Sequence, residues 1–359
     1  MNPNYSGAAG AAKLPSGCCS ILSDKFKSAS GIEIETGQIG SFSGFTRPLN
    51  DLSHNVYTFK LDDIGDSFLQ LNTAYFWIKC KIELADGNKI PSGKKWGINS
   101  AFGLSFFKSI QLLLNGFEIS ASSNSDLAYK NYFEGALSFE SNNRNISLKS
   151  SIFEIDDANH EQDFDPFSPG NNAFLKRYNK VKNSNYFDFC VPVTCDFFRS
   201  DAHLTPMNKI TLIATRQSEE FLINSTEKLD FKIKVDDVKL FYNRIRLAES
   251  LTSQIIGKPS KYISSQTQIK KFALPKSITK YNISLFSGIL PKVIVIGQIL
   301  TSACNGTYKK NPFHFQNFKL NSIGLIMNGR PHPSTPYKPE FDKDIFAREY
   351  NDMFLNSGG

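Results

Sequence analysis

Several short stretches carry residue types that could do chemistry, and "GNKIPSGKK" at 87–95 comes closest to a known motif, the phosphate-binding loop. That loop has four residues between its glycines and a Ser or Thr after its lysine to hold magnesium. Here five residues separate Gly87 from Gly93, and Lys95 stands where the hydroxyl belongs. We interpret the stretch as part of a turn-rich loop.

Nucleophiles and metal ligands are present without the spacing that catalysis or metal binding needs. "HEQDF", from His160, lacks the second histidine of a zinc-protease helix, and no Gly-x-Ser-x-Gly elbow occurs. The six cysteines show no disulfide or zinc framework and are predicted to be ordinary reduced thiols. They are Cys18, Cys19, Cys80, Cys190, Cys195 and Cys304. The sequence therefore predicts no enzyme, no metal site and no cofactor.

Two further stretches allow two interpretations each. The acidic stretch "FEIDDANHEQDFD" (153–165) could bind a cation through oxygens, but it lacks calcium-loop spacing, so a solvated loop is favoured. "YKKNPFHFQNFK" (308–319) mixes lysines with aromatic residues and could stack single-stranded nucleic acid. We favour a loop whose Phe side chains enter a sandwich core, because the aromatic positions fall on both parities and merge into a strand.

The elements that must carry these stretches are mainly β-strands. The chain has 359 residues, 31 of them Phe, and Ser, Asn, Gly and Pro recur at short intervals as in all-β folds. Strand-like segments occur throughout the chain; they are 56–61, 67–84, 106–120, 186–198, 208–217, 231–247, 267–275, 293–300 and 320–333. The spacing of apolar residues predicts one short helix over 125–139. No run approaches the roughly 18 apolar residues of a membrane span, and no secretory signal is visible.

An eight-residue pattern occurs twice and indicates two related units. "SIQLLLNG" (109–116) and "SIGLIMNG" (322–329) each end in Asn-Gly, the pair that a tight type I′ hairpin requires. Each is preceded by an Asn followed by several Phe, and each lies about 60 residues after the first clear strand of its unit. We predict a flexible arm over 1–36, a first unit over 37–248, a linker over 249–264 and a second unit over 265–359.

The second unit poses a length problem. After Gly116 the first unit continues for about 130 residues, whereas 30 residues follow Gly329. Three explanations stay open: the chain is truncated, the copies have diverged, or the second unit borrows strands from elsewhere. An unfinished sandwich exposes sheet edges.

The segment 288–341 resembles the major capsid proteins of Polinton (Maverick) elements and the related adintoviruses. The resemblance rests on Gly288, Leu290 and Pro291, on Pro339 and Phe341, and on a central motif. That motif comprises Asn305, Gly306, Asn311, Pro312, Phe313, Phe315 and Phe318. In the first unit, "FLQLNTAYFWIKCKI", Asn99, "LLLNGFEIS", Tyr129, Tyr132 and "LTPMNKITLIATRQSEEFLI" are similar to the same family. The similarity covers most of residues 55–355.

The resemblance implies an all-β double jelly roll, two eight-stranded sandwiches side by side. Family members continue with more strands after the segment that matches 288–341, so the second jelly roll is expected to be incomplete at its C-terminus. It implies a virion capsid subunit, assembled inside the host cell, that forms trimeric pseudo-hexagonal capsomers around double-stranded DNA. The partners implied are a homotrimer, neighbouring capsomers, the penton protein and packaged DNA. The net charge of +7 is compatible with DNA, although Lys and Arg are spread along the chain without a dense tract.

For this hypothesis the residues expected to matter carry fold and assembly. The paired turns are Asn115-Gly116 and Asn328-Gly329, and the shared structural loop holds Asn311 to Phe318. Two alternatives stay open. One is a minor or penton capsid protein with an added domain; the other is a monomeric β-sandwich module that binds glycan or nucleic acid.

Overall fold

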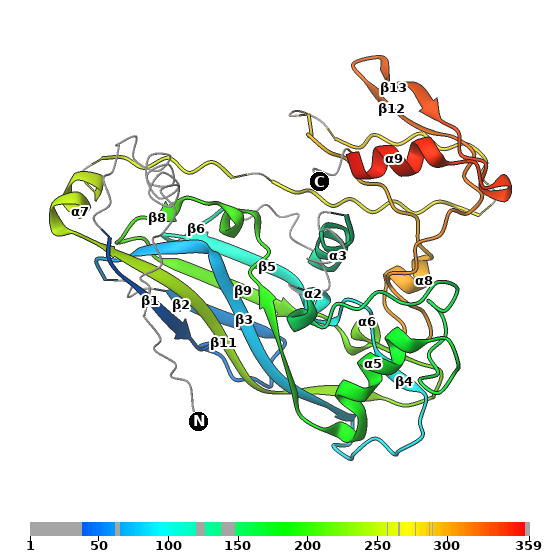
Figure 1. Ribbon diagram of the computed structural model, residues 1–359, viewed down its shortest axis with the longest axis horizontal. Helices are drawn as coiled ribbons and strands as arrows, with labels where there is room; N and C mark the ends of the chain where they lie inside the picture. The colour runs from blue at the N-terminus through cyan, green and yellow to red at the C-terminus, as the bar shows by residue number, and fades with distance from the viewer. Residues whose placement is uncertain are drawn as a thin grey trace, which may run out of the picture.

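The computed structural model describes residues 38–355, except 62–64, 120–125, 138–147 and the single residues 257, 265, 277, 287 and 289. The predicted arm over 1–36 lies outside the described residues. Residues 38–247 form two antiparallel sheets that face each other, and we call this part the first jelly roll (Figure 1). Residues 258–355 are called the second unit.

One sheet of the first jelly roll contains the two longest strands. Its order is β1 (Gln38–Thr46), β11 (Phe231–Leu247), β3 (Phe68–Leu84) and β7 (Phe187–Pro192), and the short β8 (His203–Leu204) also pairs with β3. In the middle of β3, buried Phe76, Ile78, Cys80 and Ile82 alternate with polar or amphipathic residues. A period of two places these apolar side chains on one face of the sheet.

The facing sheet is smaller. Its order is β2 (Val56–Leu61), β9 (Ile210–Arg216), β5 (Phe107–Leu114) and β6 (Phe117–Glu118). A third, two-stranded sheet pairs β4 (Trp96–Ile98) with β10 (Ile223–Ser225).

The strand order identifies the architecture. When β4, β8 and β10 are set aside, eight strands remain. Numbered along the chain, they run 1-8-3-6 in one sheet and 2-7-4-5 in the other. Each sheet therefore places a late strand between two early ones, which is the arrangement of an eight-stranded jelly roll made of two Greek keys. The first unit is thus a complete jelly roll.

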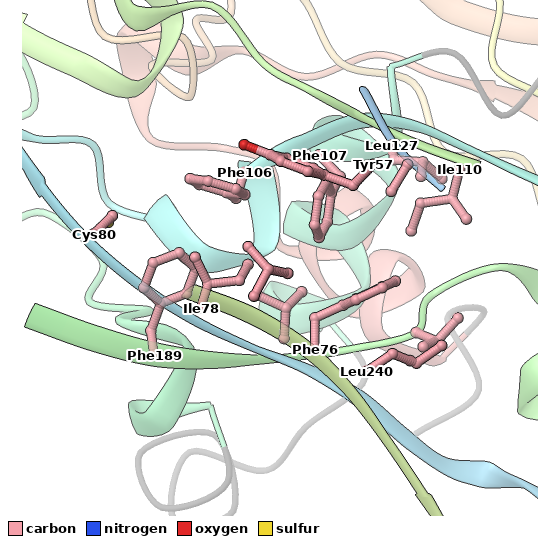
Figure 2. Close-up of a cluster of buried hydrophobic side chains, with 14 of the residues drawn as sticks. Tyr57, Phe76, Ile78, Cys80, Phe106, Phe107, Ile110, Leu127, Phe189 and Leu240 are labelled. Carbon is pink, nitrogen blue, oxygen red and sulfur yellow. The ribbon is translucent and has the colours of Figure 1, made fainter. Parts of the chain in front are cut away.

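The core lies between the two sheets. The Phe76 ring lies 5.3 Å from Phe59 and 4.8 Å from Phe107, measured between ring centroids, and these contacts join the sheets directly. Figure 2 shows Phe76 and Phe107 with Leu240 of β11 in one apolar layer. Burial of such side chains is the main favourable term in the folding of this unit.

Helices are short and cover the ends of the sandwich. The predicted helix over 125–139 is confirmed as α3 (Leu127–Leu137). A helix that was not predicted, α5 (Asn172–Val181), lies between the acidic stretch 153–165 and β7. The predicted linker begins with α7 (Glu249–Ile256). The other helical segments are α2 (Phe102–Ser105), α6 (Glu219–Leu222), α8 (Thr301–Cys304), α9 (Ala347–Leu355), η1 (Lys149–Ser151), η2 (Lys182–Ser184), η3 (Asp196–Arg199) and η4 (Phe341–Lys343).

The second unit contains one pair of strands among its described residues, β12 (Ile323–Met327) and β13 (Arg330–Tyr337). The strand-turn predicted over 320–333 is therefore confirmed. The strands predicted over 267–275 and 293–300 are wrong, because the described residues of both segments join no sheet. In Figure 1 this part of the chain, yellow to gold, extends from α7 toward the β12–β13 hairpin.

The two units nevertheless share local geometry. Asn115 and Gly116 have φ angles of 52° and 86°, and Asn328 and Gly329 have φ angles of 50° and 77°. Both pairs thus adopt the left-handed backbone that a type I′ turn demands. Each turn joins two antiparallel strands, and each hairpin is followed by a helix, α3 or α9.

A second shared feature lies upstream of each hairpin. The backbone N–H of Ala101 donates to the Asn99 side chain at 3.1 Å, and that of Phe313 donates to Asn311 at 2.9 Å. Each contact closes an Asx turn two residues long. The structure thus confirms the predicted fold class of an all-β, double jelly-roll chain. Its first jelly roll is complete, and the described part of its second unit repeats the Asx turn, the Asn-Gly hairpin and the α-helix that follows the hairpin.

In the part of the chain that the structure describes, no helix has the length and apolar character needed to cross a membrane.

Gly116→Val is expected to lower the free energy of unfolding by about 1–3 kcal/mol, because a β-branched residue is strained at positive φ. No atom lies within 4 Å of a Cβ built at Gly116, so the cost comes from the backbone alone. Urea denaturation followed by circular dichroism measures it. Lys60→Val, on the exposed side of β2, is the control. Equal midpoints for the two variants would contradict the turn assignment.

Candidate inter-unit docking site

The predicted motif of the second unit lies against the first jelly roll. We call the contact region the docking site. On the second unit it consists of Gly306, Asn311, Pro312, Phe313 and Phe315. On the first jelly roll it consists of Tyr129 and Tyr132 of α3, Asp156, Arg177 of α5, and Phe221 of α6.

The polar half of the site is centred on a buried ion pair. The Arg177 side chain is 2% exposed and the Asp156 side chain 6% exposed, and the guanidinium contacts the carboxylate directly. Arg177 also donates to the carbonyl oxygens of Ile98 at 3.0 Å and Glu154 at 2.7 Å. A buried charge is tolerated when its partners satisfy its hydrogen bonds, and this guanidinium meets that condition.

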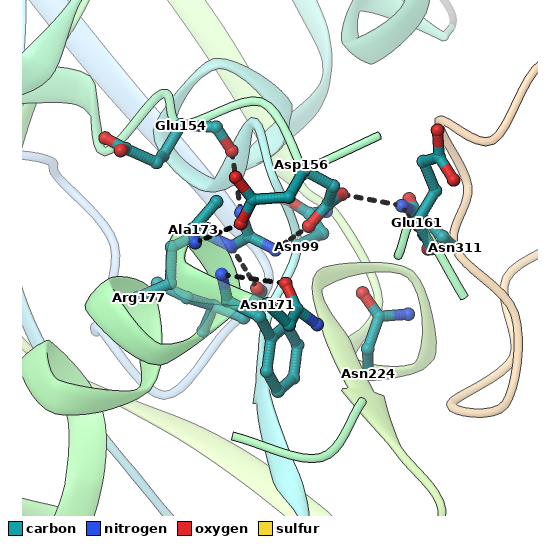
Figure 3. Close-up of polar contacts among 12 residues, drawn as sticks. Asn99, Glu154, Asp156, Glu161, Asn171, Ala173, Arg177, Asn224 and Asn311 are labelled. Carbon is teal, nitrogen blue, oxygen red and sulfur yellow. Dashed lines mark hydrogen bonds and ion pairs between the residues drawn. The ribbon is translucent and has the colours of Figure 1, made fainter. Parts of the chain in front are cut away.

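Asn311 completes this network from the second unit. Its side-chain amide donates to Asp156 Oδ2 at 2.9 Å and to the Glu161 carbonyl oxygen at 2.9 Å, as Figure 3 shows. Its own backbone N–H donates to the Gln162 side chain at 3.3 Å. Burial raises the pKa of the Asp156 carboxyl, while Arg177 and Asn311 oppose that rise. Two groups from distant parts of the chain therefore contact the same buried carboxyl group.

The position of Arg177 depends on a helix cap. Asn171 accepts a hydrogen bond from the Phe174 N–H at 3.3 Å, and Asp157 accepts one from the Ala173 N–H at 2.8 Å. These contacts satisfy backbone donors in the first turn of α5, which otherwise lack partners. The cap fixes the start of the helix, and Arg177 then lies on its buried side with Ala173 and Phe174.

The apolar half of the site is a cluster of aromatic rings. Phe313 stacks on Tyr132 with ring centroids 4.5 Å apart and an interplanar angle of 7°. It also makes edge contacts with Phe221 and Tyr129, at 5.8 and 6.0 Å. Phe315 contacts Tyr132 at 5.8 Å. Aromatic pairs in these geometries stabilise a packed contact beyond the area they bury.

Gly306 permits the close approach of the two units. Its φ of +86° favours glycine, and a Cβ built there would lie 3.2 Å from the backbone nitrogen of Phe221. Asn305, the residue before it, is exposed. The predicted motif residues thus divide into two groups. Gly306, Asn311, Phe313 and Phe315 contact the first jelly roll, and Pro312 among them is buried. Phe318 is 47% exposed and lies outside this contact.

The structure tests two of the predictions made for this region. The aromatic stretch over 308–319 enters a core at Phe313, as favoured, and Phe313 is 4% exposed. The interpretation of 153–165 as a solvated loop is wrong at Asp156, which Arg177 and Asn311 hold in the interior. The two predicted turns, Asn115-Gly116 and Asn328-Gly329, lie at hairpin tips outside the docking site.

A second contact joins the units beside α3. Buried Lys130 donates to the Thr194 carbonyl oxygen at 2.8 Å and forms an ion pair with Asp196. Asp196 in turn accepts the Thr267 N–H at 2.6 Å, and Lys271 pairs with Asp126 at 2.8 Å. The start of the second unit is therefore attached to α3 and η3. The contact joins residues far apart in the chain, and the sequence did not predict it.

No metal site is assembled at these contacts. Among the described residues, no three His, Cys, Asp or Glu side chains gather as a metal site would require. A hollow of about 290 Å³ near the end of β5 is lined by Leu114, Thr205, Pro206, Asn208, Ile256, Lys258, Ser260 and Tyr262. Its lining brings together no acid–base pair and no activated nucleophile of the kind that covalent catalysis needs.

Comparison with known proteins gives a distant relative and several matches among solved structures. No protein-family model matches the chain. An uncharacterized protein of Caenorhabditis elegans is 23% identical over 255 residues, which cover 68% of this chain and 58% of that protein.

Among solved structures, a chain of the Sputnik virophage matches with a TM-score of 0.43 at 9% identity, over 60% of this chain and 49% of that one. The Faustovirus major capsid protein matches with a TM-score of 0.39 at 9% identity, over 61% and 56%. The mavirus major capsid protein matches with a TM-score of 0.35 at 13% identity, over 69% and 52%. The chain thus spans about half the length of the solved chains it matches.

Phe313→Ala is expected to release the second unit, because it removes the ring that stacks on Tyr132 and leaves a cavity costing about 3–5 kcal/mol. Hydrogen exchange should then speed up in α3 and over 305–316, while β3 and β11 keep their protection. Phe318→Ala removes an identical but exposed ring from the same loop and is the matched control. Equal exchange in both variants would show that the site does not hold the units together.

Arg177→Met is expected to lower the free energy of unfolding by about 3–5 kcal/mol, because it leaves the Asp156 carboxylate buried without its partner. Its neighbour Lys176 pairs with Glu154 at the surface, with 68% of the lysine side chain exposed. Lys176→Met should therefore cost no more than about 1 kcal/mol. Chemical denaturation of both variants tests the assignment, and a cost below about 1 kcal/mol at Arg177 would refute it.

Proposed function

We propose that this protein is a structural subunit of an icosahedral capsid around double-stranded DNA, and that three copies form a pseudo-hexagonal capsomer. The observation that carries the proposal is the tandem arrangement. One complete jelly roll is followed by a unit that repeats its Asx turn, its Asn-Gly hairpin and the helix after it. Two jelly rolls side by side in one chain give each subunit two of the six corners of a pseudo-hexagon. The sequence resemblance to Polinton and adintovirus capsid proteins points the same way.

The outer face of the β1-β11-β3-β7 sheet supports a contact between copies. Tyr75 stacks on Phe241 at 5.2 Å, and Phe45 lies 5.5 Å from Phe241. These rings come from three adjacent strands, and 52% of Phe45 and 37% of Tyr75 are exposed. Lys239 lies over the Trp77 ring at 4.7 Å, so cations border the aromatic row. Aromatic residues beside a charged margin are typical of protein–protein interfaces.

The positive net charge of the chain supports a contact with packaged DNA. A net charge of +7 attracts phosphate without reading sequence, and such binding weakens as salt rises. The expected contact with packaged DNA is therefore non-specific. The roles of neighbouring capsomers and of a penton protein in the shell are part of the same proposal.

Light scattering on the purified chain tests the proposal, with a mass near three times 40.2 kDa as the expected result. Phe45→Glu with Tyr75→Glu should reduce the mass to that of a monomer, because carboxylates on the outer face oppose its burial. Phe117→Glu is the control, since Phe117 is 78% exposed but lies on the other sheet.

A trimer that survives the double substitution would place the contact elsewhere. A parent chain that remains monomeric at all concentrations would overturn the capsomer and favour a monomeric binding module.

A further inference from the structure

A buried lysine lies in direct contact with a carboxylate between α3 and η3. The side chain of Lys130 on α3 is 2% exposed, and its ammonium pairs with Asp196 of η3, whose side chain is 12% exposed. Lys130 also donates to the carbonyl oxygen of Thr194 at 2.8 Å. Among the described residues, the lysine of every other ion pair has a side chain at least 21% exposed. Lys130 is therefore the amine among these pairs that is best shielded from water.

A second carboxylate lies next to this pair. Glu134 follows Lys130 by four residues, so both side chains lie on one face of α3. Arg199 follows Asp196 by three residues on η3, a 3₁₀ helix in which positions three apart are eclipsed. Arg199 contacts both carboxylate oxygens of Glu134, with Nη1 2.7 Å from Oε1. The Glu134–Arg199 contact therefore runs beside the first ion pair.

The Asp196 carboxyl group has a donor on each of its oxygens. Lys130 contacts Oδ1, and the Thr267 N–H donates to Oδ2 at 2.6 Å. A fixed N–H in this position stabilises the negative charge that develops on a carbonyl oxygen when a nucleophile attacks. The hydroxyl of Thr194 is buried and has no hydrogen-bond partner among the described residues, so it can bind a small leaving group.

Burial also favours the proton transfers that a reaction between these groups needs. Two buried ions cost desolvation energy, and the transfer of one proton from an ammonium to a carboxylate removes both charges. Burial raises the pKa of the Glu134 carboxyl, while Arg199 and Lys130 oppose that rise. A carboxyl group with a raised pKa can both accept and return a proton near neutral pH.

We propose that Lys130 and Asp196 condense to an isopeptide bond that joins α3 to η3, with Glu134 as the general base and acid. Lys130 Nζ gives one proton to the Asp196 carboxylate and then attacks its Cγ, so that a C–N bond forms. Glu134 takes a proton from the nitrogen and delivers it to the Oδ1 hydroxyl; the C–O bond breaks and water leaves. One ammonium and one carboxylate thus give one amide and one water, and no oxidant or cofactor is needed.

Two other ion pairs show why the position of Lys130 matters. Arg177 is buried beside Asp156, but a guanidinium keeps its proton in proteins and is no nucleophile. Lys81 lies 2.6 Å from Glu83, but its side chain is 21% exposed, and the hydrogen bond to Glu83 raises the pKa of Lys81. Lys81 therefore stays an ammonium.

The bond would fix the helix on which the docking site is built. It links two residues that are 66 positions apart, and a cross-link of this kind restricts the unfolded chain as a disulfide does. α3 carries Tyr129 and Tyr132, which contact Phe313 of the second unit. The bond does not depend on capsid assembly, because all of its groups belong to one chain.

Mass spectrometry of the purified full chain tests the bond. Under denaturing conditions the parent is expected to be lighter than its sequence mass by one water molecule. Lys130→Arg should keep its full mass, because arginine cannot act as the nucleophile. Comparison of the two masses cancels any processing that both chains share.

Peptide mapping locates the same bond. Trypsin should not cut after Lys130, so the digest should contain residues 109–144 joined to residues 183–199. Lys81 is the internal control and is expected in linear peptides alone.

Two variants test the chemistry. Asp196→Asn should form the same amide with loss of ammonia in place of water. Glu134→Gln should slow bond formation roughly 100-fold, because it removes the general base and acid. The rate is followed by intact mass in chains made by cell-free translation. Glu154→Gln is the matched control and should leave the rate unchanged, since Glu154 pairs with the exposed Lys176 away from this site.

Several results would overturn the proposal. One is a parent chain that has its full sequence mass. Another is a water loss that maps to Asp86–Gly87, because Asp before Gly can form a succinimide, which gives a linear peptide and is hydrolysed by alkali. Equal rates in Glu134→Gln and its control would overturn the role of Glu134. If Lys130→Arg does not fold, Asp196→Asn decides the question, because absence of its joined peptide would contradict the bond.

Discussion

The structure depends on one constraint of jelly-roll topology: the last strand of the unit lies in the middle of a sheet. β11 pairs with β1 on one side and with β3 on the other, and Gln38 lies opposite Leu247 across the whole unit. The sheet cannot close before β11 is in place. Nearly all of its pairings are therefore long-range, which is the kind of topology whose folding is slow. The hydrophobic layer around Phe76 forms only when both sheets are present, because it draws on each of them.

The same constraint accounts for the contrast between the two units. A hairpin such as β12–β13 needs only its own turn, so it forms wherever Asn-Gly supplies the left-handed backbone. A hairpin alone is marginally stable in water. The second unit is held instead by the first, through Asn311 in the Asp156–Arg177 network and Phe313 among the rings of α3 and α6. The polar contacts fix the position of the loop, and the rings supply the apolar area.

Sequence predicted most of the main strands of the first jelly roll, because a period of two survives in segments such as 231–247, whose predicted and observed bounds agree. It missed β1, which pairs with β11. It also predicted both turns, since Asn-Gly is a local requirement. It missed α5, although Asn171 as cap and Ala173, Phe174, Tyr178 and Val181 at helical spacing were available signals. It could not predict that Asp156 is buried, because its partners Arg177 and Asn311 are 21 and 155 residues away. Segments 267–275 and 293–300 have the apolar pattern of strands. A β-strand also needs a neighbouring strand with which to form hydrogen bonds, and the described residues of these segments have none.

The seven lysines of residues 257–300 affect whether this extended segment can pair with another copy of the chain. An extended apolar segment with unpaired backbone groups invites pairing between copies, and lysine on an open edge opposes this by like-charge repulsion. Every copy carries the same seven charges, so repulsion acts against other copies and within the segment itself. The charge distribution therefore opposes pairing of this segment between copies of the chain.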